Sequence, residues 1–288
     1  MLSLELVNLT ALMDRGSGSS GLMIGLIDGP VATQHADLAG QRLQELPGKH
    51  RTRCADVTST ACRHGTFVAG ILSARRDSLA PAICPGCRLL VCPVFAEASS
   101  PCEHMPSATP LDLAAAIVGC IDAGARVVNL SLALTQPSTR GEQALEEALH
   151  HAVRHDVIVV AAAGNQGTVG GSAITRHPWV IPVVACDLRG RPMNESNLGS
   201  SIGRRGLRAP GDAITSLGAD GRPLSLTGTS VAAPFVTGAV ALLWSEFPTA
   251  TATQIKLAIT QPRLRPASVA PPLLDAAAAY QRLLTAVA

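Results

Sequence analysis

The stretch Leu22-Met23-Ile24-Gly25-Leu26-Ile27 is an apolar run that ends at Asp28 and is followed at once by Gly29-Pro30. A short apolar run bounded by turn residues is typical of a buried strand. In open α/β sheets, functional sites form outside the carboxyl ends of the parallel strands. We therefore expect Asp28 to stand at such a site. The alternative interpretation is that its carboxylate simply caps the turn.

Similar runs recur along the chain and alternate with longer helical patterns. Strands are predicted over residues 22–27, 88–94, 126–132, 157–163 and 180–185, and helices over 64–74, 111–123, 141–155 and 230–245. This alternation predicts an α/β fold with a doubly wound, mostly parallel central sheet and helices on both faces. We expect a single domain over residues 21–288, preceded by a short N-terminal segment at 1–20.

Composition agrees with one compact body and excludes some classes of partner. Hydrophobic residues make up 47% of the 288 residues, charged residues 15% and aromatic residues 2%. Alanine, valine and leucine then fill the core, as suits parallel strands under helices. With a net charge of +2 and few aromatic rings, no nucleic-acid partner is expected. The apolar helices are interrupted by Gly, Pro and charges, so no membrane association is expected either.

The motif Gly228-Thr229-Ser230-Val231-Ala232-Ala233-Pro234 places a serine at the start of an apolar helix. Backbone N–H groups are unpaired at a helix start, and the helix dipole favours negative charge there. Such an environment suits a nucleophilic serine whose attack on a carbonyl generates an oxyanion. A Gly-Thr-Ser turn that merely caps the helix is the alternative.

A histidine heads a second apolar helix in His64-Gly65-Thr66-Phe67-Val68-Ala69-Gly70. Taken alone, His64 can be a polar helix cap. Together, the order Asp28, His64, Ser230 predicts a catalytic triad. In it Ser230 is the nucleophile, His64 the general base, and Asp28 the group that orients the imidazole and stabilises its cation.

At these three motifs, and over roughly residues 20–260, the chain resembles the subtilisin-like serine protease family, whose triad has the same order. Two further segments are similar to that family. Val127-Val128-Asn129-Leu130-Ser131-Leu132 resembles the strand that lines the substrate cleft. Val157–Asn165 resembles the strand whose terminal asparagine completes the oxyanion hole. The resemblance implies that residues 21–288 form a subtilisin-like catalytic domain.

The resemblance also implies roles for individual residues. Asn165, with the Ser230 backbone N–H, would donate to the oxyanion; an ordinary Gly-Asn turn is the alternative. The implied substrate-binding residues are Asn129, Ser131, Leu132, Ala133, Ala162, Ala163, Gly164, Gly171 and Ser172. None of them carries a carboxylate, so small or medium neutral side chains are expected before the cut bond. An extended peptide would pair with residues 129–133 as an added strand.

The residues that follow Asp28 differ from the usual pattern of the family and indicate a particular branch of it. The acid is usually followed by Ser or Thr and then Gly, whereas here the sequence is Asp28-Gly29-Pro30-Val31. This sequence is similar to the subtilisin-like proteases of cyanobactin and related ribosomal-peptide pathways, which trim leader or recognition segments. The expected partner is then a precursor peptide.

The alternatives are a general intracellular degradative protease, a macrocyclase or ligase using the same acyl-enzyme, and a catalytically silent binding module. Relatives that cyclise carry a capping insertion, for which the interval between Asp28 and His64 is too short.

The N-terminus carries no evident secretory signal, and only about twenty residues precede the first strand, so a cytoplasmic location is expected. The spacing of Leu4, Val7, Leu9 and Leu12 allows a short helix that docks on the body.

No cofactor or metal is expected. A calcium site after the His64 helix would have only Asp77 as a carboxylate. Cys84-Pro85-Gly86-Cys87 allows reduced thiols, a local disulfide or a zinc pair; zinc would need Cys92, Cys102 or His104, since there is no second Cys-x-x-Cys. Cys54 and Cys62 can pair under oxidising conditions, which a cytosolic location opposes.

Overall fold

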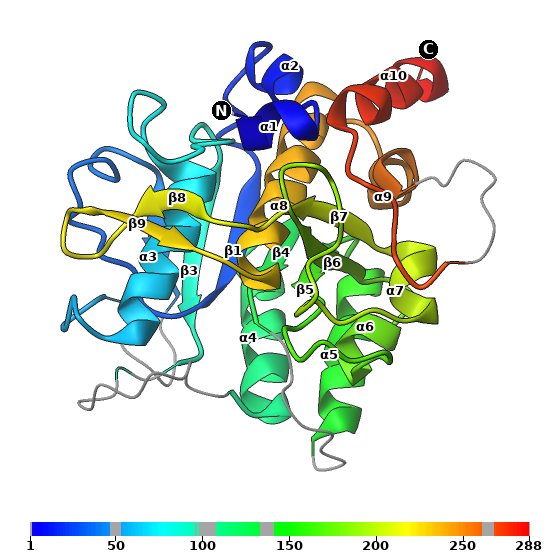
Figure 1. The fold of residues 1–288 in the computed structure, drawn as a ribbon, viewed down its shortest axis with the longest axis horizontal. Coiled ribbons are helices and arrows are strands. Elements are labelled where there is room, and N and C mark those ends of the chain that lie inside the picture. The colour runs from blue at the N-terminus through cyan, green and yellow to red at the C-terminus, as the bar shows by residue number, and fades with distance from the viewer. Residues whose placement is uncertain are drawn as a thin grey trace.

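The computed structural model describes residues 2–46, 53–95, 97, 108–132, 141–260 and 268–287. Its centre, in this described part, is a seven-stranded sheet with the order β2-β3-β1-β4-β5-β6-β7, and every pairing is parallel (Figure 1). The strands are β1 (Met23–Asp28), β2 (Leu43–Glu45), β3 (Arg88–Pro93), β4 (Val127–Leu130), β5 (Ile158–Ala162), β6 (Ile181–Cys186) and β7 (Leu207–Pro210). An antiparallel hairpin, β8 (Ile214–Leu217) and β9 (Pro223–Leu226), lies outside this sheet.

Helices cover both faces of the sheet, as the alternation predicted. Along β1, Ile24 and Leu26 join the core cluster that includes the helices α3 (Thr60–Ser73) and α8 (Thr229–Glu246). Met23 and Ile27 join the cluster formed with α4 (Pro110–Asp122) and α5 (Glu142–Arg154). Side chains alternate between the faces of a strand. The near-continuous apolar run of β1 therefore feeds two cores at once.

The bounds of one predicted helix need correction. The helix expected over residues 64–74 begins at Thr60, because the Ser59 Oγ accepts a hydrogen bond from the Cys62 N–H at 3.1 Å and caps the first turn. His64 therefore sits in the second turn rather than at the head of the helix. The short strands β2, β7, β8 and β9 were not predicted. Neither were α6 (Ala173–Arg176) and α7 (Ser200–Arg205), which have six residues or fewer.

Both ends of the described chain pack onto the same part of the body. The N-terminal residues form two short helices, α1 (Leu2–Leu6) and α2 (Thr10–Met13), where one was expected. Val7 and Leu9 are fully buried in the main core, and the Val7 carbonyl accepts a hydrogen bond from the Ala276 N–H at 3.0 Å. Figure 1 shows α1 and α2 beside α10 (Ala276–Val287), near α9 (Ala252–Thr260). Among the described helices, none has the length and apolar character needed to cross a bilayer.

Candidate active site

Three elements bring the predicted triad together. Asp28 is the last residue of β1, which lies between β3 and β4. His64 projects from α3, and Ser230 is the second residue of α8. The Asp28 Oδ1 lies 2.7 Å from the His64 Nδ1, and the His64 Nε2 lies 3.0 Å from the Ser230 Oγ. Asp28 is fully buried and Ser230 half-buried, so the chain of hydrogen bonds runs from the core toward a partly exposed serine.

The surroundings of Asp28 fix its carboxylate and the histidine tautomer. Its Oδ1 also accepts a hydrogen bond from the Gly29 N–H at 2.6 Å, while its Oδ2 is buried and has no hydrogen-bond partner among the described residues. Because an ionised carboxylate can only accept, the His64 Nδ1 carries the proton. The Nε2 is then free to accept the proton of the Ser230 hydroxyl, as a general base must.

The electrostatics of His64 follow from the same contact. Burial of the ring acts to lower its pKa, but the negative charge of Asp28 and the hydrogen bond to it act in the opposite direction. The net effect raises the pKa of His64 above its ordinary value of 6.5. The imidazolium that would form during catalysis is thus stabilised by Asp28.

Asn165 lies on the exposed turn after β5, and Thr229 orients it. The Thr229 N–H and Oγ1 each donate to the Asn165 Oδ1 at 2.9 Å, and the Thr229 Oγ1 accepts from the Gly164 N–H at 3.1 Å. These bonds hold the amide oxygen, so the Nδ2 is left to donate. Gly228 has a φ of 141°, and a Cβ there would come within 3.0 Å of the Asn165 Nδ2, so only glycine fits. Sequence reasoning missed Thr229; its place beside Ser230 was the available signal.

The predicted substrate contact by Asn129 is wrong. Asn129 is fully buried in β4, paired with Leu26 of β1 and Val160 of β5. Its side chain is bonded to Ser131 and Thr237. A strand with neighbours on both sides has no free edge for a peptide, so substrate cannot pair with residues 129 and 130 either.

The other predicted pocket residues lie at the carboxyl ends of β4 and β5. Leu130 is in register with Ala161, so the segments that follow these strands leave the sheet side by side. Leu132, Ala162 and Ala163 are buried. Ser172 has a local role, because it caps α6 and exchanges hydrogen bonds with Thr175. Ala133 lies outside the described residues. A substrate role for Ser131, Leu132, Ala162, Ala163, Gly164, Gly171 and Ser172 stays a prediction.

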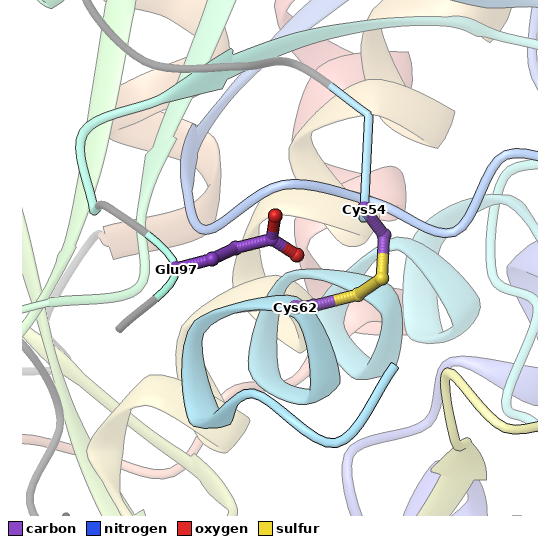
Figure 2. Close-up of side chains that lie close together, drawn as sticks. All are labelled: Cys54, Cys62 and Glu97. Atoms are coloured by element: carbon purple, nitrogen blue, oxygen red, sulfur yellow. A yellow bond between two sulfur atoms is a disulfide. The ribbon is translucent and has the colours of Figure 1, made fainter. Parts of the chain in front are cut away.

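A disulfide joins Cys54 to Cys62, two residues before His64 (Figure 2), with a Cα–Cα distance of 5.4 Å. The Glu97 carboxylate lies beside it and accepts hydrogen bonds from the N–H groups of Ala55 and Asp56 at 3.0 and 3.1 Å. Within the described ranges, these three side chains are the group close enough to share a metal ion. The two sulfurs are bonded to each other, so they offer no thiolates, and Glu97 instead binds the loop backbone.

The Cys-x-x-Cys segment considered for zinc is also described by the structure. Cys84 and Cys87 are buried free thiols rather than a disulfide. Of the three candidate zinc partners, Cys92 is a buried free cysteine, whereas Cys102 and His104 lie outside the described residues.

Comparison with known proteins also points to a subtilisin-like protease. The sequence model of the subtilase family matches residues 19–269. The thermophilic serine proteinase of Bacillus sp. (strain AK1) is 34% identical over 81% of this chain, which spans 54% of that protein's length. A solved structure of the protease domain of PatA, in a mutant form, is 29% identical with a TM-score of 0.83, covering 94% of this chain and 98% of that one.

A second solved structure, the prenylagaramide maturation protease PagA, is 28% identical with a TM-score of 0.81. The match covers 96% of this chain and 98% of PagA. The family match spans both the seven-stranded sheet and the three residues of the hydrogen-bonded triad. The chain therefore belongs to the subtilase family.

Proposed function

We propose that this protein is a serine endopeptidase that hydrolyses peptide bonds through an acyl-enzyme on Ser230. The observation that carries the proposal is the continuous chain from the Asp28 Oδ1 through His64 to the Ser230 Oγ, with distances of 2.7 and 3.0 Å. Nucleophile, base and orienting acid are each within hydrogen-bond reach of the next, which is the geometric requirement for nucleophilic catalysis.

The reaction follows from these positions. As the Ser230 Oγ attacks the peptide carbonyl, the His64 Nε2 takes its proton, and Asp28 stabilises the resulting cation. The Asn165 Nδ2 and the Ser230 backbone N–H donate to the oxyanion of the tetrahedral intermediate. His64 then returns the proton to the leaving amine. Water repeats the attack on the acyl-enzyme and releases the second product.

We further infer that the substrate is a ribosomally made precursor peptide, from which the enzyme removes a leader or recognition segment. Two observations support this. The solved structures similar to this chain include maturation proteases, PagA and the patellamide protease PatA. The turn after the acid is Asp28-Gly29-Pro30-Val31, without the hydroxyl residue usual at the second position. An extended peptide would lie along Ser131 and Leu132, past the end of β4.

We place the enzyme in the cytoplasm, where such precursors are synthesised. The Cys54–Cys62 disulfide weighs against this location, because cytosolic thiols are kept reduced. Alkylation of the cysteines in lysates quenched with acid, followed by mass spectrometry, decides the point. Free Cys54 and Cys62 fit a cytoplasmic enzyme, whereas an intact disulfide with the protein outside the cytoplasm contradicts that location.

The substrate class is tested by comparing cleavage of unfolded casein with cleavage of precursor peptides encoded beside the enzyme's gene, with Ser230→Ala as the background control. Selective cleavage of a precursor at one position supports the proposal. Rapid, indiscriminate casein digestion supports a general degradative protease instead. A product one water lighter than the hydrolysed peptide indicates a macrocyclase.

A further inference from the structure

The proline within α8 removes a hydrogen-bond donor from the nucleophile's own carbonyl. In an α-helix, the carbonyl of residue i accepts from the N–H of residue i+4. The residue four positions after Ser230 is Pro234, which has no N–H. The Ser230 carbonyl therefore lacks its regular donor within the helix. It instead accepts a hydrogen bond from the Ser131 Oγ at 2.9 Å.

That hydroxyl belongs to a longer chain of buried polar groups. The Asn129 Nδ2 donates to the Ser131 Oγ at 2.7 Å, and the Thr237 Oγ1 donates to the Asn129 Oδ1 at 2.7 Å. Thr237 and Asn129 are fully buried, and Ser131 is 1% exposed. We call Thr237, Asn129, Ser131 and the Ser230 carbonyl the buried polar chain.

The direction of every bond in the buried polar chain is fixed by its last member. The Ser230 carbonyl can only accept, so the Ser131 hydroxyl must donate to it and must itself accept from Asn129. The Asn129 amide must then turn its Nδ2 toward Ser131 and its Oδ1 toward Thr237, whose hydroxyl donates. One lost donor at Thr237 leaves a buried acceptor unpaired and removes what orients the amide.

The buried polar chain ties the nucleophile to a rigid element. Asn129 stands in β4, which is hydrogen-bonded to β1 on one side and to β5 on the other. Thr237 lies seven residues after Ser230 in the same helix, two turns along, so the chain links the beginning of α8 to its middle through the sheet. The first turn of α8 is where the 3.0 Å distance between the Ser230 Oγ and the His64 Nε2 is set.

We propose that Asn129 and Thr237 are positioning residues for the proposed peptidase reaction. They act through Ser131 to hold the backbone of Ser230 at the distance its proton transfer to His64 requires. The inference rests on the proposed function. It gives Asn129 a role in positioning Ser230, in place of the predicted contact with substrate. Thr237 is fully buried and is linked to Ser230 through Asn129 and Ser131. Its effect on catalysis is conformational, because small misplacements of reacting groups slow reactions strongly.

The test uses Thr237→Val, which keeps the shape of the side chain but removes the hydroxyl, and Thr237→Ser, which keeps the hydroxyl. Thr260→Val is the matched control, because among the described residues the Thr260 hydroxyl donates to the Lys256 carbonyl of its own helix, at 2.7 Å. Two rates are measured for each protein: peptide hydrolysis, and sulfonylation of the Ser230 hydroxyl by a small sulfonyl fluoride, which releases fluoride and needs no peptide binding.

Thr237→Val is expected to lower kcat and the sulfonyl fluoride rate by roughly ten- to a hundredfold, with KM changed less than about twofold. Thr237→Ser restores most of both rates, and Thr260→Val changes neither. Thr237→Val with a lower melting temperature but unchanged rates would show a purely structural role and overturn the inference. A wild-type protein that neither hydrolyses peptides nor reacts with the sulfonyl fluoride would instead overturn the proposed function.

Discussion

A Cβ atom on Gly29 would lie 2.0 Å from the carbonyl oxygen of Ala61. The turn that follows Asp28 therefore touches the first turn of α3, backbone against backbone. Gly65 makes the reciprocal approach, because a Cβ there would lie 2.4 Å from the Gly29 carbonyl oxygen. This close packing lies between the strand end that carries Asp28 and the helix that carries His64, and a Ser or Thr at position 29 would meet the same backbone.

Replacing Gly29 with Ala should therefore damage activity and stability together. No rotamer can relieve a clash with backbone, so α3 must move away and the 2.7 Å bond between Asp28 and His64 must lengthen. We expect kcat/KM to fall by roughly a hundredfold or more and the melting temperature to drop. Gly21→Ala is the control for stability, since its Cβ would meet only the Ser19 Oγ at 3.5 Å. A fully active Gly29→Ala protein would show that the contact does not set the triad geometry.

The pH profile should report the raised pKa of His64. The imidazole must be neutral to accept the Ser230 proton, and a raised pKa keeps it protonated to higher pH. Activity should therefore be lost as the pH falls, with the midpoint of the acid limb of kcat/KM above the ordinary value of 6.5. Asp28→Asn removes the charge that raises the pKa, so its residual activity should have a lower midpoint. It should also lower turnover by about 10⁴-fold. An acid limb below pH 6 in the wild type would contradict this assignment.

Reduction of the Cys54–Cys62 disulfide should destabilise the protein and slow it. The bond closes a loop between residues separated by eight positions, and a loop of this length contributes about 2–3 kcal/mol to the free energy of unfolding. We expect dithiothreitol to lower the denaturant midpoint and kcat together, because Cys62 lies two residues before His64 in α3. A Cys54→Ser, Cys62→Ser double variant should have the denaturant midpoint and kcat of the reduced protein. Dithiothreitol should change neither value in this variant. Equal sensitivity of this variant would trace the effect to other cysteines.

Much of this fold could be predicted from the sequence, and there are physical reasons why the other elements could not. The long apolar runs and helical periods gave five of the sheet strands and the four long helices that carry or cover the site, because each buries a full face of side chains. Short edge strands such as β2, which has three residues, bury too little to leave a pattern. The hydrogen bonds of Asn129 inside the core could not be predicted either. Its partners Ser131 and Thr237 come together only when β4 and α8 pack against each other.

Peptides with a small or medium neutral residue before the cut bond should be preferred over those with Arg or Lys. The residues proposed to line that pocket, among them Leu132, Ala162 and Ala163, carry no carboxylate that could pair with a cation, and a buried unpaired cation is costly. Mass spectrometry of products from a mixed peptide library gives the preference directly. Dominant cleavage after basic residues would show that other side chains form the pocket.

The most direct test of the central claim is the site of covalent labelling by a fluorophosphonate, located by peptide mass mapping in the wild type and in Ser230→Ala. The account predicts one adduct, on Ser230, whose extent matches the loss of peptide hydrolysis. The Ser230→Ala protein should keep its fold but show neither the adduct nor hydrolysis. An adduct on a different residue, or hydrolysis that survives in Ser230→Ala, would contradict the assignment of Ser230 as the nucleophile.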